Sequence, residues 1–208
     1  MKNISKHVSV ALLSALALVG VAALILGQKV KAAGEGKITG SVKLSGTAPH
    51  MKGIDMSKDP YCVKANATPA HLETVVAGAS GGLENVVLYI SAGLPAGAEA
   101  EVPTTVPVFD QKNCMYTPHV LALDVNQKFK VTTSDQTTHN IHPWMHGWYV
   151  VVKGPYGTTD ANGSYTINNV PPGSYTVTAW QEDLGTQTAK VTVAGGAAAT
   201  ADFTFKAK

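Results

Sequence analysis

The sequence predicts an all-β protein, and three observations carry this prediction. After residue 33, apolar and polar residues alternate with a period of two in short stretches, as they do in half-buried strands. Gly, Pro, Asn and Asp separate these stretches. Almost nothing in this part of the chain has the period of a long amphipathic helix. Short strands joined by turns indicate a β-sandwich or a Greek-key barrel.

The first half supplies four of the predicted strands. KITGSVKLSG (37–46) alternates apolar and polar residues, and ENVVLYI (84–90) is a continuous β-branched run of the kind found in fully buried strands. HVLALDV (119–125) and KFKVTT (128–133) follow, separated by the turn residues Asn126 and Gln127.

The second half has five further strands separated by clear turns. DANG (160–163) predicts a hairpin turn in which Gly163 takes a positive φ, and PPG (171–173) predicts another tight turn. We expect Trp180 to be a core aromatic or a cap at the end of the sheet. The strands expected here are GWYVVV, GSYTINNV, GSYTVTAW, TQTAKVTV and ADFTFKA, with Tyr165, Ile167, Tyr175, Val177 and Ala179 pointing inward.

Residues 1–33 have the composition of an export segment. Lys2 and Lys6 give it a positive start, residues 8–26 are apolar throughout, and VKA at 30–32 supplies small residues for cleavage before Ala33. The apolar run just reaches the roughly 20 residues that span a bilayer. The segment is therefore either a cleaved signal peptide or a retained N-terminal membrane anchor. Either alternative places the remainder outside the cytoplasm, in the periplasm or at the cell surface.

Composition restricts the partners. Hydrophobic residues make up 45% of the chain and charged residues 14%, which suits a packed core. From residue 33 onward, twelve lysines face fourteen acids, a net charge of −2, and the chain has no arginine. We therefore expect no nucleic-acid partner and no bidentate clamp for phosphate. Cys62 and Cys114, the only cysteines, can pair in an oxidising compartment.

The stretch from Tyr156 to Val193 resembles the carboxypeptidase regulatory-like module, a small prealbumin-like β-sandwich of exported bacterial proteins. The resemblance covers about 155–206 and rests on YGTTDANGSYTINNVPPGSYTVTAWQEDLGTQTAKVTV. Upstream, DPYC, ENVVLYI, DQKNCMYTPHV and THN resemble exported proteins in which a cupredoxin-like domain precedes such a module. The resemblance implies a cupredoxin-like β-sandwich over 34–149, a prealbumin-like β-sandwich over 150–208, and a structural Cys62–Cys114 disulfide.

The same resemblance implies copper ligands in HNIHPWMHGW (139–148). In that family THN supplies the first histidine, and a later Cys-x-x-His-Pro-Trp-Met supplies the cysteine, the second histidine and the axial methionine. This sequence runs from THNIHP directly into PWMHGW, so the copper cysteine is missing and the cupredoxin-like domain is shortened. The resemblance therefore carries over His139, His142 and Met145.

Without a thiolate, a different copper site is expected. Two or three imidazoles and a thioether still suit copper, and His146 adds a third imidazole to His139, His142 and Met145. The alternative is that these histidines cap strand ends and bond to backbone groups. His119 is a further candidate ligand, with a backbone-bonded role as its alternative.

Two classes of function remain open. In the first, the protein is an exported copper-binding relative of cupredoxins, related to electron transfer, with a redox or envelope protein as its partner. In the second, it is a non-catalytic envelope or surface β-sandwich module that binds carbohydrate or protein. The sequence has no Gly-x-Ser-x-Gly elbow, His-Glu-x-x-His or phosphate loop, and we expect Glu182 and Asp183 to be solvated acids. We therefore expect no enzyme, and a membrane contact only through residues 8–26 if they are not cleaved.

Overall fold

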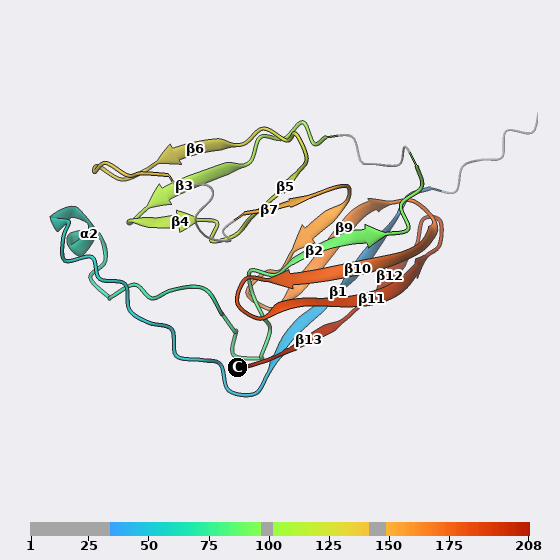
Figure 1. Cartoon of the computed structure of the whole chain (residues 1–208), viewed down its shortest axis with the longest axis horizontal. Helices are drawn as coiled ribbons and strands as arrows, with labels where there is room; N and C mark the ends of the chain where they lie inside the picture. The colour runs from blue at the N-terminus through green and yellow to red at the C-terminus, as the bar shows by residue number, and fades with distance from the viewer. Residues whose placement is uncertain (1–33, 97–101, 142–148) are drawn as a thin grey trace, which may run out of the picture. The chain divides into compact units, whose positions relative to one another are not determined.

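The computed structural model describes residues 34–96, 102–141 and 149–208. As predicted, the regular secondary structure of this part of the chain is almost entirely β (Figure 1). Its one helix, α2 (Pro60–Ala65), has six residues. No helix within the described ranges is long and apolar enough to cross a bilayer. The predicted export segment, residues 1–33, lies outside these ranges.

One sheet of a β-sandwich is organised around the first strand, β1 (Gly36–Ser45). The antiparallel strand β9 (Ser164–Val170) lies along one edge of β1. Two short parallel strands, β12 (Ala198–Thr200) and β13 (Phe203–Lys206), follow one another along the other edge. The N-terminal part of the described chain is therefore built into the same sheet as its C-terminal part.

Two residues explain how β1 accommodates the break between β12 and β13. The Asp202 carboxylate fills the break, because it accepts hydrogen bonds from the backbone N–H of Ser41 at 2.7 Å and from the Ser41 hydroxyl at 2.9 Å. Gly40 is required beside it, since a Cβ there would lie 1.9 Å from the carbonyl oxygen of Ala201.

The second sheet has the order β11-β10-β2-β8. Its strands are β2 (Val87–Ala92), β8 (Tyr156–Thr158), β10 (Gly173–Gln181) and β11 (Gly185–Val193). The strands β10 and β11 form a hairpin of nine residue pairs, and β2 is antiparallel to both β10 and β8. The predicted turn at DANG is confirmed, with Gly163 at a φ of +75°.

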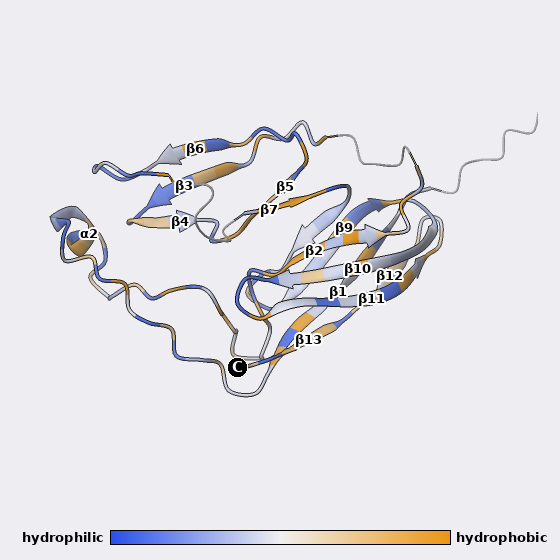
Figure 2. Ribbon diagram, viewed as in Figure 1, coloured by the Kyte–Doolittle hydropathy of each residue, from blue (hydrophilic) through white to orange (hydrophobic). Residues whose placement is uncertain are grey.

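The two sheets enclose one continuous core. The five side chains predicted to point inward from β9 and β10 are all buried. Phe205, Ile38, Leu83, Leu88 and Val177 are among its fully buried side chains. Figure 2 shows the hydrophobic segments of β2 and β13 among these strands. This core identifies the paired sheets as a sandwich rather than a closed barrel.

Five further strands lie between β2 and β8 in the sequence. Parallel strands β5 (Leu121–Asp124) and β7 (Tyr149–Val152) form a two-stranded sheet. One face of this pair carries Ala122 and Val152, which cluster with Val87 of β2 and pack against Trp180. Trp180 is therefore a packed aromatic at the end of β10, as predicted.

The other face of β5 carries Leu121 and Leu123, which cluster with Phe109. Phe109 belongs to a three-stranded sheet of order β4-β3-β6, made of β3 (Val108–Lys112), β4 (Met115–Thr117) and β6 (Lys130–Thr133). The predicted turn between β5 and β6 is present, with Asn126 at a φ of +66°.

The predicted boundary between residues 149 and 150 does not separate two sheets. The strands β1 and β2 precede it, yet they pair with strands that follow it in both sheets of the sandwich. Ala33–Lys208 forms one compact unit. The sheets that contain residues 150–208 therefore include two strands from the part predicted as a separate domain. The strand β1 pairs with β9, β12 and β13, and β2 pairs with β8 and β10.

Candidate functional site

The predicted disulfide between Cys62 and Cys114 is confirmed, with the two Cα atoms 5.7 Å apart. Cys62 lies in α2, which begins at Pro60. The Asp59 carboxylate caps the helix by accepting hydrogen bonds from the N–H groups of Tyr61 at 2.8 Å and Cys62 at 3.2 Å. Asp before Pro is a common helix start, so this local pattern could have revealed the helix from the sequence.

Cys114 lies at the turn between β3 and β4. Asn113 and Cys114 both take positive φ values, 54° and 60°, which are unusual for residues other than glycine. The carboxylate of Asp135 holds this conformation, because it accepts hydrogen bonds from the N–H of Asn113 at 2.6 Å and from that of Cys114 at 2.7 Å.

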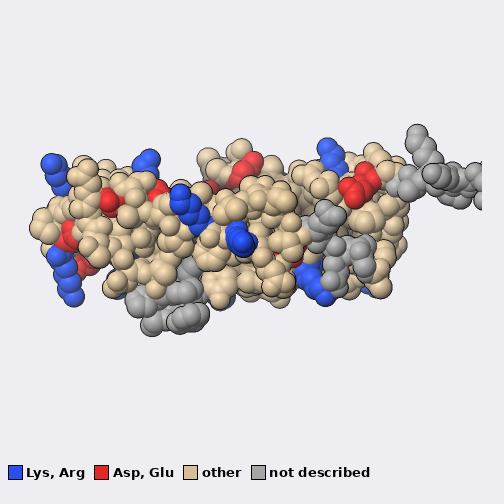
Figure 3. All heavy atoms as spheres, turned by 90° about the horizontal axis from the view of Figure 1, so that it is seen from above, with Lys and Arg blue, Asp and Glu red and all other residues tan. Residues whose placement is uncertain are grey.

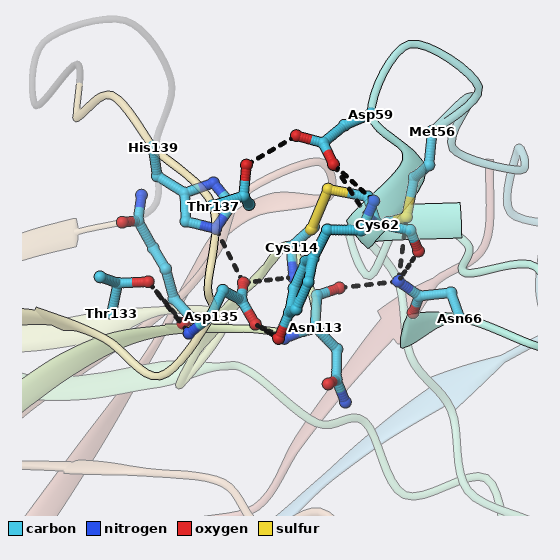
Figure 4. The surroundings of a disulfide bond; sticks show 12 residues. Met56, Asp59, Cys62, Asn66, Asn113, Cys114, Thr133, Asp135, Thr137 and His139 are labelled. Atoms are coloured by element: carbon cyan, nitrogen blue, oxygen red, sulfur yellow. Dashed lines mark hydrogen bonds and ion pairs between the residues drawn. A yellow bond between two sulfur atoms is a disulfide. The ribbon is translucent and has the colours of Figure 1, made fainter. Parts of the chain in front are cut away.

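Asp135 is the centre of a polar network around the disulfide (Figure 4). Its carboxylate also accepts a hydrogen bond from the Tyr61 hydroxyl at 3.2 Å and lies 2.7 Å from Nε2 of His139. The Asp135 side chain is 1% exposed. Burial raises its pKa, but the hydrogen bonds from Cys114, His139, Asn113 and Tyr61 outweigh burial and hold the pKa below the ordinary aspartate value.

Among the described residues, Cys114, Asp135 and His139 have ligand-type atoms within 4.8 Å of one another. The disulfide excludes Cys114 as a thiolate ligand. Asp135 already accepts hydrogen bonds at both carboxylate oxygens. In its oxidised state this cluster is therefore a structural centre that joins α2, the β3–β4 turn and the segment after β6.

His139 is the one member of the predicted copper set that the structure describes. Its Nε2 faces the Asp135 carboxylate, so the N–H at Nε2 is the donor and Nδ1 is the ring nitrogen that offers a lone pair. His142, Met145 and His146 lie outside the described residues. The ligand set His139, His142, Met145 and His146 therefore stays a prediction.

His119 occupies a different environment from His139. Its Nε2 lies 2.8 Å from the Glu182 carboxylate, and its Nδ1 lies 3.6 Å from that of Glu73. Burial lowers the pKa of His119, but the hydrogen bond that its ring N–H donates to Glu182 and the charges of Glu182, Glu73 and Glu84 outweigh burial and raise the pKa above the ordinary histidine value. A metal-ligand role for His119 stays a prediction.

Glu182 corrects one expectation. Its side chain is only 15% exposed, although its place in the loop between β10 and β11 predicts a solvated acid. Partnership with His119 explains the burial, since a buried charge requires a partner. The sequence gives no indication of this pair, because 63 positions separate the two residues. Asp135 was also missed, since neighbouring residues carry no motif that marks it.

Exposed apolar side chains gather along β3 and β6. We call the set Val106, Val108, Phe129 and Val131 the β3–β6 patch. These side chains are between 38% and 50% exposed. Because β3 and β6 are paired, with Val108 opposite Lys130 and Phe109 opposite Val131, Val108 lies on one face of the sheet and Val131 on the other. The set is therefore shared between the two faces, with Phe129 and Val131 alternating onto the same face of β6.

Charged residues are dispersed rather than concentrated. Figure 3 shows lysines and acids scattered singly or in small groups over the face that it presents. This distribution agrees with the near-neutral composition and offers no broad basic surface on that face for a nucleic acid.

Comparison with known proteins gives a match to one family model over part of the chain. The model of the carboxypeptidase regulatory-like domain matches residues 146–206, in agreement with the module predicted from the sequence. No curated protein and no solved structure matches the chain. The cupredoxin-like part of the resemblance therefore stays a prediction. The match covers β7–β13, and in this protein β1 and β2, which lie outside it, complete the two sheets of the sandwich.

Proposed function

We propose that this protein is a non-catalytic β-sandwich module, exported from the cytoplasm, that binds another envelope or surface protein. The observation that carries the proposal is the open edge of β6, next to which Phe129 and Val131 are exposed. The regulatory-like family match at 146–206 supports a non-catalytic module. The disulfide and the export-type segment support a place outside the cytoplasm.

The strand β6 is suited to pairing with a partner strand. The N–H groups of Lys130 and Ser134 bond to the segment containing β3, so the alternation along a strand turns the backbone groups of Val131 and Thr133 to the opposite edge. No other described strand pairs with that edge. An extended segment of the partner can bond there while its apolar side chains cover Phe129 and Val131, which lie on the same face of β6.

Charge further restricts the partner. Lys128 and Lys130 are exposed beside the patch, and lysines on an edge strand discourage pairing between identical copies. An extended partner segment with acidic residues next to apolar ones complements this edge. The open strand edge favours protein over carbohydrate, because the main-chain groups of a paired partner strand satisfy its unpaired N–H and C=O groups.

A photo-crosslinking amino acid at position 131, in the full chain expressed in its own host, tests the proposal. A matched control carries the same group at Val63, which is 52% exposed on α2. We expect a defined protein adduct at 131 only. Binding of the purified adduct partner should protect the amides of Val131 and Thr133 from hydrogen exchange, and Val131→Asp should abolish that protection. Equal adducts at both positions, or glycan binding that Val131→Asp leaves unchanged, would contradict it.

Copper binding is a second candidate function, favoured by the pairing of His139 with Asp135. Histidines that bind metals usually donate their other ring N–H to a carboxylate or carbonyl, and His139 has this arrangement with Nδ1 as the remaining nitrogen. His142, His146 and Met145 would complete the set. With no free cysteine, Cu(II) held by imidazoles should form a nitrogen-coordinated centre that lacks the intense sulfur-to-copper absorption.

Metal analysis of the full chain, purified without a histidine tag, tests this second candidate. We expect one copper per chain in the native protein and none in the double variant His142→Ala, His146→Ala. Copper content that the double variant leaves unchanged would contradict this ligand set, and an intense blue colour would show that a cysteine reaches the metal.

A further inference from the structure

Two exposed histidines that are distant in the sequence lie against each other in the long segment between β1 and β2. The ring centroids of His50 and His71 are 5.8 Å apart, and the rings are nearly perpendicular, at 87°. Neither residue belongs to the copper set considered above. Their proximity is not visible in the sequence, where 20 residues separate them.

The backbone holds the two segments that carry these histidines in register. Gly53 and His71 form an antiparallel bridge. Hydrogen bonds of 2.8 Å from the N–H of Ile54 to the carbonyl of Ala70, and of 2.9 Å from the N–H of Leu72 to the carbonyl of Lys52, flank this bridge. The Cα positions of the histidine pair are therefore fixed by a short ladder, so that bringing the rings together costs little additional backbone entropy.

A hydrogen bond orients the ring of His71. Its Nδ1 lies 2.9 Å from the carbonyl oxygen of Met51, and because a carbonyl can only accept, Nδ1 carries the proton. In neutral imidazole this leaves the lone pair at Nε2. Histidines that bind a metal through one ring nitrogen commonly donate the N–H of the other ring nitrogen to a carboxylate or a backbone carbonyl.

The spacing of the rings fits a shared ion. In protein sites an imidazole nitrogen lies about 2.1 Å from zinc, so two imidazoles on one ion have ring centroids roughly 5–6 Å apart. The 5.8 Å separation falls in this range. Such a site also requires one nitrogen of the exposed His50 side chain to turn toward the ion.

We propose that His50 and His71 form a two-imidazole site for a divalent transition-metal ion of the Zn²⁺, Ni²⁺ or Cu²⁺ class, with water in the other coordination positions. Imidazole nitrogen suits these ions. The sulfur of Met51 is not a ligand in this site, because it accepts a hydrogen bond from Thr74 and its side chain packs against the sandwich core. A bound ion would join the two arms of the segment between β1 and β2.

The test uses the full chain with His142→Ala and His146→Ala, which removes the other imidazole-rich stretch from the measurement. Substoichiometric Cu²⁺ should broaden the ring resonances of His50 and His71 and the amide resonances of Gly53 and Leu72. Zn²⁺ affinity, measured by calorimetry, should fall by at least the roughly 10- to 100-fold that loss of a supporting group costs a metal site in either His50→Ala or His71→Ala.

Both histidines are exposed, so these variants should keep the fold, which the dispersed amide spectrum of the sandwich verifies. Lys58→Ala serves as the control and should leave Zn²⁺ affinity unchanged, because Lys58 is exposed in the same segment and its ammonium group offers no lone pair. Broadening confined to other residues would overturn the proposal. An affinity that survives His50→Ala but not His71→Ala would overturn the two-imidazole site and leave a single histidine as the ligand.

Discussion

The sandwich formed by β1, β2 and β8–β13 has a core of nineteen buried apolar side chains among the described residues. We call α2, the β4-β3-β6 sheet and residues 134–141 the disulfide lobe. The buried cluster at this lobe contains Phe109 together with Leu121 and Leu123 of β5. The disulfide lobe has this smaller buried cluster, and it also has a disulfide bond and a buried carboxylate that accepts four hydrogen bonds.

This difference shows two ways of stabilising β-structure in one chain. A long hairpin and a central strand bury enough apolar surface for the sandwich to be stabilised mainly by the hydrophobic effect. Short strands of three to five residues bury little, and small cores usually depend on disulfides or similar links. The expected consequence is that the two regions lose stability under different treatments.

The largest effect should follow from a cavity in the sandwich. Phe205 is 2% exposed, and Phe205→Ala should lower the free energy of unfolding by roughly 3–5 kcal/mol. Chemical denaturation followed by far-ultraviolet circular dichroism measures this change. The exposed Val151→Ala is the control and should change the free energy of unfolding by less than about 0.5 kcal/mol. If both variants lose a similar amount of unfolding free energy, burial of the core is not the main source of the stability of the sandwich.

Removal of the disulfide should act mainly on the lobe. The double variant Cys62→Ser, Cys114→Ser opens a loop with a sequence separation of 52, which should cost up to about 4 kcal/mol in the free energy of unfolding of the lobe. Hydrogen exchange should show faster exchange at Asn113 and Cys114 positions, while Val177 in β10 retains its protection. If exchange accelerates equally in β10, the two regions unfold as one unit and the comparison fails.

Asp135→Asn should have a smaller but more local effect. The amide of the variant places an NH₂ group where a carboxylate oxygen of Asp135 accepts hydrogen bonds. At least one hydrogen bond to a charged group is therefore lost, which should lower the free energy of unfolding by roughly 2–3 kcal/mol. Because the pKa of Asp135 is lowered in the folded state, its contribution is present above about pH 3.9 and is lost as the pH falls through the folded-state value.

Acid unfolding of the lobe, followed by the fluorescence of a probe attached in the lobe, measures this dependence. Asp110→Asn is the matched control. Asp110 lies in β3 and accepts hydrogen bonds from only two hydroxyl groups, those of Thr132 and Ser134, so it should contribute less than Asp135 to the free energy of unfolding of the lobe. An identical acid midpoint for Asp135→Asn and the native protein would show that Asp135 does not hold the lobe.

The smallest effect should be the pH dependence of the His119–Glu182 pair. Because the pKa of His119 is raised on folding, the stabilisation is fully present below about pH 6.5 and is lost as the pH rises through the raised folded-state value. Glu182→Gln should therefore reduce the unfolding free energy by about 1 kcal/mol at pH 5.5 and by less at pH 8.5. A reduction that does not change with pH would assign Glu182 a packing role only.

The fold class and the turns could be predicted from the sequence because they depend on neighbouring residues. Alternation revealed the inward side chains of β9 and β10, and glycine revealed the turn at Gly163. The sheets that cross the predicted division at residue 149 could not be predicted, because pairing between β1 and β13 depends on residues far apart in the chain. The partnerships of Asp135 with His139, of His119 with Glu182 and of His50 with His71 were equally inaccessible, since each polar residue is ordinary in its local sequence.

Pairing of β1 with β13 joins positions such as Ser41 and Asp202, which are 161 residues apart. Contacts of this kind give a topology of high contact order, which slows folding because a long loop must close before the contact forms. As the chain leaves the ribosome, β1 has no partner on that edge until β12 and β13 have been synthesised. The order of synthesis therefore leaves the first sheet incomplete until β12 and β13 have been made.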